Sequence, residues 1–397
     1  MLSRLFLLII SVMPHAALAS EKWSENWNIP LGYQFRIFPN VPQFTEQHAN
    51  DNSFFIKPQY KSTVFDKYDF HFEPYYLWDE FDKNRTHFDI RELTLSIPIE
   101  SSSFGGLWVL GIDKVFWGVT ETQHLVDIVN QSDTVASFDA NEKLGQPMIR
   151  FELSKWGQWQ FIAMTGFRER TFASANGRLR SPLPVDTKSP VILKPEDFDL
   201  ALRWGNTFDK LDIALSHFYG TSREPILEID PLFTKLTPIY DEINQTGAEI
   251  QYSFENLILK SEIISRTGFL DVNDFWAYTL GFEQSFGDFF GTHLGLIVEY
   301  SYDDRGRVAP SVFQDDYFLG FRLSLNDAFE SNIFIGATED DETKARTVSF
   351  KYNRRIMDNL NFSLKTLTFS NIPDPIVDPL MGVQNDSYCE IGLTQYF

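Results

Sequence analysis

Several features are scarce in this chain of 397 residues. Cys389 is the single cysteine, which excludes a framework of intramolecular disulfides. Beyond residue 20 no apolar run reaches the roughly 18 residues that a membrane-spanning helix needs. Basic residues are outnumbered, with 34 Lys and Arg against 55 Asp and Glu, a net charge of -21. Because nucleic acid requires a basic surface, this balance argues against such a partner.

The first residues carry the pattern of a secretory signal peptide. Arg4 supplies a positive charge, residues 5–12 form a short apolar core, and Ala17-Leu18-Ala19 provides a small-residue cleavage site. We therefore predict a cleavable signal peptide at 1–19 and an exported mature chain at 20–397. No linker rich in Pro, Gly or Ser divides the mature chain, so it is expected to form one domain.

Apolar and polar residues alternate with a period of two throughout the mature chain. In the segment 198–204 the large apolar residues Phe198, Leu200, Leu202 and Trp204 oppose Asp199, Ala201 and Arg203. The same pattern recurs at 294–302 and 317–325. Aromatics make up 16% of the chain, although its mean hydropathy is only -0.22. Strands that are apolar outward and polar inward, with many aromatics, are typical of transmembrane β-barrels.

Counting such segments predicts an all-β, antiparallel transmembrane barrel of about 18 strands, or 16 if the first segments do not pair. The expected strands lie near 31–38, 53–64, 68–81, 86–99, 107–117, 148–155, 157–168, 197–206, 209–220, 246–254, 256–267, 273–286, 290–303, 315–326, 330–339, 344–355, 358–370 and 386–397. Every second connection is short, whereas the others, such as 118–147 and 169–196, are long and polar. We therefore expect the short connections to be periplasmic turns and the long connections to be extracellular loops.

One segment breaks the alternation. Phe88 and Ile90 share one parity, whereas Leu93 and Leu95 share the other. A β-bulge near Arg91-Glu92 would put all four on one face. Alternatively, Phe88 lies above the bilayer in an extension of the strand.

The last strand, 388–397, resembles the closing strand of bacterial outer-membrane β-barrels. It alternates and ends in an aromatic residue, Phe397, although Gln395 stands where another apolar residue is expected. The resemblance implies location in the outer membrane of a Gram-negative cell. It also implies contact with lipid and lipopolysaccharide, and recognition of Phe397 by the barrel-assembly machinery. The oligomeric state is left open.

The connection 118–147 is the most distinctive of the long loops. Leu125, Ile128 and Val129 recur at helical spacing and need a surface to pack against. Either the loop folds into the barrel and narrows a channel, or it forms an extracellular lid. The stretch resembles porin-like outer-membrane proteins in which a strand ending in Trp-Gly precedes a segment bearing Asp and Asn. The matching residues are Trp117, Gly118, Asp127, Asn130 and Asp133, of which the last three are expected to face solute.

Ionisable side chains fall on the inward faces of the expected strands, as a water-filled lumen would allow. The candidates for lining the pore or its constriction are Asp127, Asn130, Asp133, Arg150, Glu152, Arg203, Lys260, Glu262, Arg266, Glu299, Arg322 and Lys351. Four arginines of the next long loop are candidates for binding an anion, Arg168, Arg170, Arg178 and Arg180. The favoured alternative for these four is pairing with loop carboxylates or contact with lipopolysaccharide phosphates.

A porin-like channel for passive diffusion of small hydrophilic solutes is the function that this resemblance implies. One alternative is a non-conducting surface barrel whose loops bind a partner, lipid or polysaccharide. A hydrolase is less favoured, because no Gly-x-Ser-x-Gly elbow and no His-Glu-x-x-His motif is present. We therefore expect no enzymatic activity, no cofactor and no metal site.

Overall fold

A computed structural model describes residues 26–100, 104–139, 141–187, 191–192, 198–289, 291–373 and 380–397. The predicted signal peptide lies outside these residues. The strands are β1 (Trp27–Asn28), β2 (Pro30–Ile37), β3 (Asn50–Ile56), β4 (Gln59–Val64), β5 (Tyr68–Asp79), β6 (His87–Glu100), β7 (Gly105–Asp113), β8 (Gln146–Ser154), β9 (Gln158–Thr165), β10 (Val191–Ile192), β11 (Phe198–Phe208), β12 (Leu211–Thr221), β13 (Ile226–Ile229), β14 (Leu236–Tyr240), β15 (Glu242–Phe254), β16 (Leu257–Gly268), β17 (Phe275–Phe289), β18 (Thr292–Asp303), β19 (Asp315–Ser324), β20 (Asn332–Asp340), β21 (Arg346–Met357), β22 (Leu360–Ser370) and β23 (Tyr388–Tyr396). Among the described residues, short 3₁₀ turns lie at η2 (Asp271–Asn273), η3 (Gly306–Val308) and η4 (Met381–Val383).

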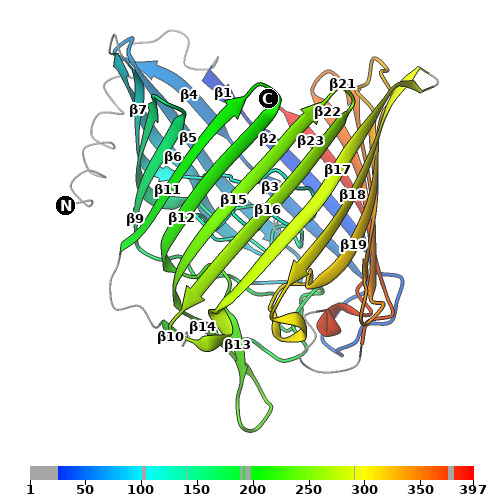
Figure 1. Ribbon diagram of the computed structural model, residues 1–397. Coiled ribbons are helices and arrows are strands. Elements are labelled where there is room, and N and C mark those ends of the chain that lie inside the picture. Colours follow the sequence, from blue (N-terminus) through cyan, green and yellow to red (C-terminus); the bar gives the residue numbers. More distant parts are fainter. Residues whose placement is uncertain are drawn as a thin grey trace.

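Twenty of the strands form one antiparallel sheet that closes into a barrel (Figure 1). Strands β1 and β2 are two parts of one barrel strand, and so are β3 and β4, which leaves 18 positions around the wall. The break between β3 and β4 falls at Lys57 and Pro58, where proline has no N–H to donate. The predicted count of 18 is therefore confirmed.

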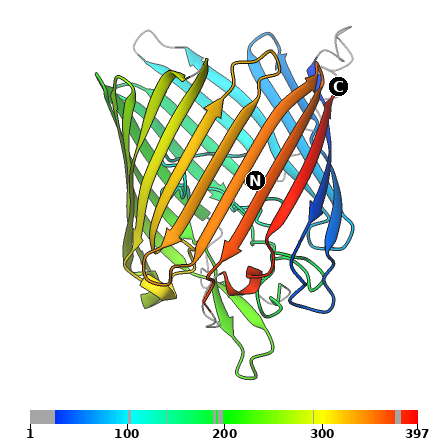
Figure 2. The ribbon, with the colours of Figure 1, turned by 90° about the vertical axis from the view of Figure 1, so that its right-hand side faces the viewer.

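The closing seam joins the first and last strands. Strand β2 pairs with β23 from Pro30 opposite Tyr396 to Ile37 opposite Cys389. Beyond the ladder, Ile29 and Phe397 exchange two backbone hydrogen bonds of 3.1 and 3.3 Å. Both strands reach the same end of the barrel, which we call the turn end because its connections are short (Figures 1 and 2). The opposite end, the loop end, carries the long connections.

The outer wall is apolar, as the alternation predicted. Leu200, Tyr317 and Leu319 point outward and are about half exposed, whereas Asp199 and Ala201 point inward and are buried. No helix among the described residues is long and apolar enough to cross a membrane. A wall of exposed apolar side chains around a closed barrel is the surface that lipid covers.

The predicted β-bulge is present in β6. Glu73 of β5 pairs with Glu92, whereas the next residue, Pro74, pairs with Ile90. Arg91 is therefore the extra residue, and its side chain is completely buried inside the barrel. The extra residue shifts the alternation phase, so that residues of opposite parity on its two sides share a face.

A small second sheet lies beyond the loop end. Strand β14 pairs with β13 in a hairpin and with β10 in parallel. The hairpin projects away from the barrel (Figure 1), which sets it apart from the other connections.

Candidate functional site

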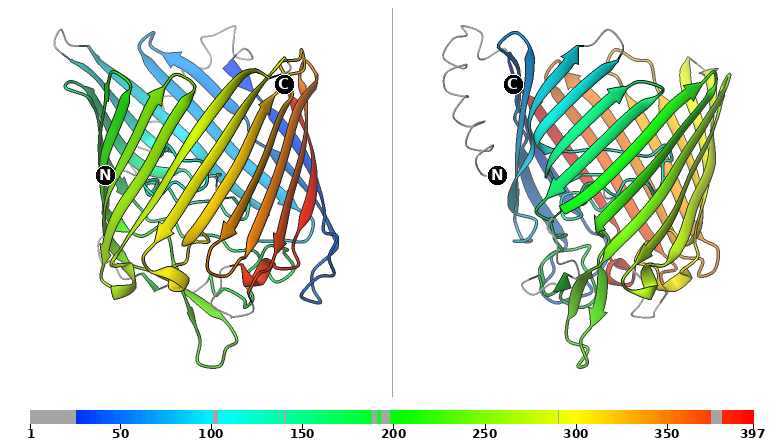
Figure 3. Two further views of the ribbon diagram at one scale, coloured as in Figure 1. Left: turned by 45° about the vertical axis from the view of Figure 1, so that its right-hand side comes forward. Right: turned by 60° about the vertical axis from the view of Figure 1, so that its left-hand side comes forward.

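The connection between β7 and β8 folds into the barrel. Strand β7 ends at Asp113, so the connection covers residues 114–145 and is longer than the predicted 118–147. We call it the lumen loop, and it lies between the walls in the side views (Figure 3). Its residues bond to inward-facing side chains of β16, β18, β19, β21 and β22. The inward-folded alternative is therefore confirmed and the lid alternative is wrong.

An apolar core fixes the loop to one side of the wall. Val126, Ile128 and Val129 are buried together with inward-facing residues of β8, β9, β11, β12, β15, β16 and β17. The wall side chains in this core include Met148 and Phe218, which interrupt the polar lining. The apolar stripe predicted on the loop thus has a partner, and this part of the lumen is filled with side chains.

Glu262 of β16 is the main polar anchor of the loop. Its Oε1 accepts hydrogen bonds from the Val119 N–H at 2.7 Å, the Thr120 N–H at 3.0 Å and the Thr120 hydroxyl at 2.6 Å. Its Oε2 accepts from the Val126 N–H at 3.3 Å. The carboxylate is completely buried, so these donors replace the water it has lost.

A second carboxylate holds the next turn of the loop. Glu299 of β18 accepts from the N–H groups of Glu121 and Thr122 at 2.7 and 2.9 Å, and from the Thr122 hydroxyl at 2.7 Å. The Glu121 carboxylate in turn lies 2.9 Å from Arg322 of β19. Two glutamates and one arginine of the wall therefore hold residues 119–122.

The residues of the Trp-Gly motif organise the loop itself. The Asn130 side chain accepts from the Val115 N–H and donates to the carbonyls of Asp113 and Leu144 at 2.9 and 3.0 Å. It thereby ties together the two ends of the loop. Asp127 accepts from the Trp117 N–H and lies 3.1 Å from Lys143.

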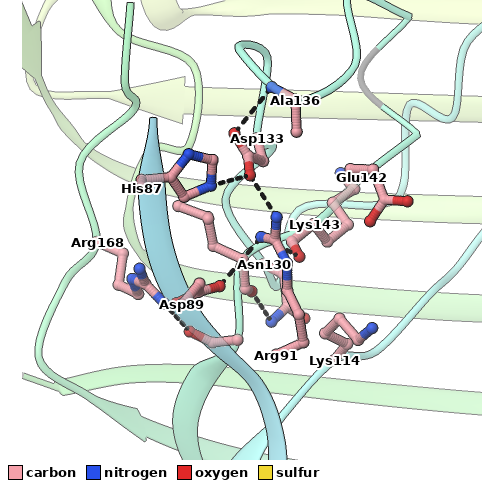
Figure 4. A network of polar contacts seen from close by, with 12 residues as sticks. His87, Asp89, Arg91, Lys114, Asn130, Asp133, Ala136, Glu142, Lys143 and Arg168 are labelled. Atoms are coloured by element: carbon pink, nitrogen blue, oxygen red, sulfur yellow. Dashed lines mark hydrogen bonds and ion pairs between the residues drawn. The ribbon is translucent and has the colours of Figure 1, made fainter. Parts of the chain in front are cut away.

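Asp133 belongs to a buried charge network around the bulge (Figure 4). Its Oδ2 accepts from Arg91 and lies 2.9 Å from His87 Nε2, while its Oδ1 accepts from the Ala136 N–H. Arg91 also donates to Asp89 at 3.0 Å. Asp127, Asn130 and Asp133 are all buried. The prediction that they face solute is wrong, because their polar atoms hold the lumen loop in place.

The pH dependence of stability should reveal this role of Asp133. Burial alone would raise the pKa of its carboxyl, but the hydrogen bond from His87 and the charge of Arg91 outweigh it and lower the pKa to about 2. The carboxylate therefore stabilises the fold by about 2 kcal/mol above its unfolded pKa of roughly 3.9, and this contribution disappears as the pH falls through 2. Urea unfolding of the wild type and of Asp133→Asn should differ by this amount at pH 6. If the difference in unfolding free energy between the two proteins stayed constant down to pH 2, the lowered pKa of Asp133 would be contradicted.

The far tip of the lumen loop meets basic side chains across the barrel. Asp139 Oδ2 lies 3.0 Å from Lys351 of β21 and 3.4 Å from Lys365 of β22. Burial alone would raise the pKa of the Asp139 carboxyl, but the two lysine charges hold it well below its usual range. The carboxylate therefore stays charged, and the loop touches the wall on both sides of the lumen.

The predicted wall candidates fall into two groups. The side chains that keep contact with solvent are Arg150, Glu152, Arg203, Lys260, Arg322 and Lys351. Glu262, Arg266 and Glu299 are buried, so the prediction that they line the open pore is wrong. The two glutamates are covered by the lumen loop, and Arg266 pairs with Glu224 at the loop end. Sequence reasoning missed Glu121 and Asp139, because nothing in the local pattern distinguishes them from other loop carboxylates.

The four arginines of the next connection are engaged within the protein. Arg168 pairs with Asp89 at 2.7 Å and Arg178 with Asp386 at 2.6 Å, which confirms the favoured alternative for these two. Arg170 donates to the carbonyl of Arg223, and Arg180 to that of Ala175.

These bonds hold residues 166–187, which we call the mouth strap. Besides Asp386, the strap meets the connections after β2 and β5, through Gln47 and Asp82. It therefore extends at the loop end from β9 to the connection that precedes β23.

No three His, Cys, Asp or Glu side chains are grouped as ligands for a metal within the described part of the chain. Asp127, Asn130 and Asp133 of the lumen loop each make hydrogen bonds to the backbone of the loop. The loop and the facing wall carry fixed charges of both signs, at Glu121 and Arg322 and at Asp139 and Lys351.

Comparison with known proteins gives likeness of structure alone. No family model and no curated protein matches the chain. Solved structures that match include several mutants of the porin of Rhodopseudomonas blastica. A double mutant of that porin is 10% identical with a TM-score of 0.45, and a triple mutant is 9% identical with a TM-score of 0.46. Each of these two matches covers 94% of this chain and 99% of the porin chain. The strand pairing of this chain itself gives the fold, an 18-stranded antiparallel β-barrel with a loop folded into its lumen.

Proposed function

We propose that this protein is a passive channel of the outer membrane for small hydrophilic solutes, with the lumen loop as its constriction. The observation that carries the proposal is the solvent contact of charged side chains inside the barrel. Arg322 and Lys351 keep 42% and 34% of their side-chain surface exposed although both point into the lumen. Contact with water favours charges inside the barrel, because burying even a paired charge in a dry interior carries a large desolvation cost.

Residues of both signs face this water. Lys351 and Arg322 stand beside Asp139 and Glu121 of the loop, and Arg150 stands beside Glu152 on the opposite wall. Fixed charges at a narrow point set the selectivity of a pore. The proposed solutes are therefore small and polar, and they pass between the lumen loop and the strands that carry these charges. The turn end would face the periplasm, as its short connections favour.

Conductance of the purified protein in a planar bilayer tests the proposal directly. Stepwise ion conductance by correctly folded protein would support the channel. Folded protein that shows no steps at any voltage would rule it out. Folding is followed independently by the heat-dependent shift in gel mobility that closed barrels display.

Removing the Asp139 charge should change the ion preference of the channel. The variant Asp139→Asn leaves Lys351 and Lys365 without their shared carboxylate, so the permeability ratio of chloride to potassium should rise about twofold or more. The reversal potential under a KCl gradient measures this ratio. The matched control is Asp230→Asn, which removes an exposed carboxylate from the projecting hairpin and should leave the ratio unchanged. If Asp139→Asn and Asp230→Asn had the same permeability ratio of chloride to potassium, a constriction at Asp139 would be contradicted.

The projecting hairpin favours one second candidate, a surface barrel that binds a partner. Leu232 and Phe233 at its tip are 79% and 64% exposed, and the hairpin points away from the barrel (Figure 1). Exposed apolar residues on a protruding element are frequent in binding sites. This function would replace the channel if the folded protein did not conduct.

A further inference from the structure

Two lysines stand side by side on the lumen face of the barrel, where the tip of the lumen loop reaches the wall. Lys351 of β21 and Lys365 of β22 are cross-strand partners. Like charges directly opposite each other destabilise a sheet, so this pair needs an anion beside it. Lys351 keeps 34% of its side-chain surface exposed and Lys365 keeps 21%, so both ammonium groups remain in contact with lumen water.

The structure already holds one carboxylate at this pair. Asp139 Oδ2 accepts from both ammonium groups, at 3.0 Å from Lys351 and 3.4 Å from Lys365. An oxygen anion therefore fits between the two lysines. The Asp139 side chain is itself 31% exposed, so its position is open to the lumen.

One carboxylate does not balance two lysines. The cross-strand partner of Lys365 on β23 is Glu390, but Arg36 holds that carboxylate at 2.5 Å. Among the residues that the structure describes, neither ammonium forms an ion pair with a carboxylate other than Asp139. Each ammonium has three N–H donors and gives one to Asp139, so further donors face the water. The pair keeps an excess of one positive charge.

The neighbours of the pair toward the turn end are neutral. Asn353 and Ser363 are cross-strand partners of each other and lie two residues from Lys351 and Lys365, about 7 Å along the strands. A carboxylate accepts several hydrogen bonds through its two oxygens, and those from charged donors are the strongest. Two ammonium groups beside an amide and a hydroxyl therefore suit a carboxylate.

The lumen loop can free this position without leaving the wall. Phe138, the residue before Asp139, packs against Phe369 with 5.8 Å between the ring centroids, within an apolar cluster at the loop end. This contact fixes the backbone of the tip. The Asp139 carboxylate needs only to rotate about its own side-chain bonds to leave the lysines, and its Oδ1 already accepts from the Ser137 hydroxyl of the same loop.

We propose that Lys351 and Lys365 form a binding site for the carboxylate group of a small solute, and that Asp139 fills this site when no solute is present. The solute carboxylate replaces that of Asp139 on the two ammonium groups. It leaves when Asp139 returns, as passage through a pore requires binding that is weak enough to be reversed. The inference rests on the proposed function, because the solute reaches the pair through the lumen, and it narrows the solutes to those that carry a carboxylate.

Saturation-transfer NMR with propionate measures binding to the full-length protein in detergent. The buffer contains about 0.1 M KCl, which screens exposed charges beyond roughly 10 Å and fills a site that accepts any small anion. We expect a dissociation constant of about 1–10 mM, because a ligand of so few atoms gains little binding energy. Lys351→Met and Lys365→Met should each weaken binding about fivefold or more. The matched control is Lys344→Met, which removes the same charge from the exposed connection between β20 and β21 and should bind propionate like the wild type.

A second pair of variants tests whether Asp139 competes with the solute. Asp139→Asn should bind propionate about fivefold or more tightly, because a tethered group lowers the apparent affinity by the fraction of sites that it fills. The matched control is Glu121→Gln, which removes another carboxylate of the lumen loop, beside Arg322 and two strands away from Lys351. It should change the dissociation constant by less than about twofold, because the salt screens a charge at that distance.

Three outcomes would overturn the proposal. The first is wild-type protein that binds no propionate at millimolar concentration, a result that does not depend on how the variants fold. The second is equal tightening in Asp139→Asn and Glu121→Gln, because the general field of the lumen would then explain the gain. The third is equal binding by Lys365→Met and Lys344→Met. Folded protein that conducts without binding propionate would keep the channel and lose the site, so the two proposals fail separately.

Discussion

Replacing Arg91 with methionine is expected to lower the free energy of unfolding by about 3–5 kcal/mol, the largest effect of any single substitution that we anticipate. The guanidinium is completely buried and contacts the carboxylates of Asp89 and Asp133 and the carbonyl of Lys143. Methionine fills a similar volume but leaves Asp133 with His87 as its remaining basic partner. Most of the loss therefore comes from a buried carboxylate that has lost a counter-charge. Equilibrium unfolding in urea, from lipid vesicles, measures it.

Two comparisons make this prediction specific. Arg346→Met breaks an exposed pair with Glu339 and should cost about 1 kcal/mol or less. The double variant Arg91→Met, Asp133→Asn removes both the cation and the carboxylate that depends on it. It should be more stable than the sum of the single changes predicts, because the unpaired charge is gone. The network would not hold the loop if the stability losses of the two single variants were strictly additive. The same would follow if Arg91→Met cost as little stability as Arg346→Met.

The barrel could be predicted from the sequence because its causes are local. Side chains alternate between the two faces of a strand, so the sequence of one strand is enough to predict that Leu200 faces outward and Asp199 faces the lumen. The same parity located the bulge, since Phe88 and Leu93 can share a face only if one residue between them is extra. Closure then follows from the chain ends, because β2 and β23 would otherwise be unpaired edges.

The path of the lumen loop could not be predicted in the same way. Its direction depends on contacts between residues more than a hundred positions apart, such as Thr120 with Glu262. One signal was available. Ile264 shares the inward parity of Glu262 and Arg266, and Phe218 shares that of Ser216, yet both are apolar. Apolar residues on a lumen face show where something must pack, and they could have indicated the side of the wall on which the loop lies.

The roles of Asp127, Asn130 and Asp133 could not be predicted from the sequence either. Their polarity on an inward-folded loop predicts that they face solute, but a loop with few backbone partners needs side chains to satisfy its N–H and carbonyl groups. Asn130 meets this need with three bonds to the backbone of the loop ends. A polar residue in such a loop is therefore a candidate for structure before it is a candidate for the pore.

Releasing the lumen loop should have the largest effect on conductance. The double variant Glu262→Ala, Glu299→Ala removes the acceptors of five backbone and two hydroxyl hydrogen bonds from residues 119–126. The freed N–H groups must then find water, which is present in the lumen and absent beneath the loop. We expect the loop segment to leave the wall and single-channel conductance to rise about twofold or more. Single-channel recording in a planar bilayer measures the change.

Point substitutions isolate this effect better than deletion of the loop, because deletion would also remove Val126, Ile128 and Val129 from the core. Glu249→Ala is the matched control. Glu249 is the cross-strand partner of Glu262 and is equally buried in the wall, but it bonds to Arg203 and not to the lumen loop. Its loss should destabilise the barrel and leave conductance unchanged. If folded Glu262→Ala, Glu299→Ala conducts like Glu249→Ala, the loop does not limit the pore, and the constriction must be formed by the wall or the mouth strap.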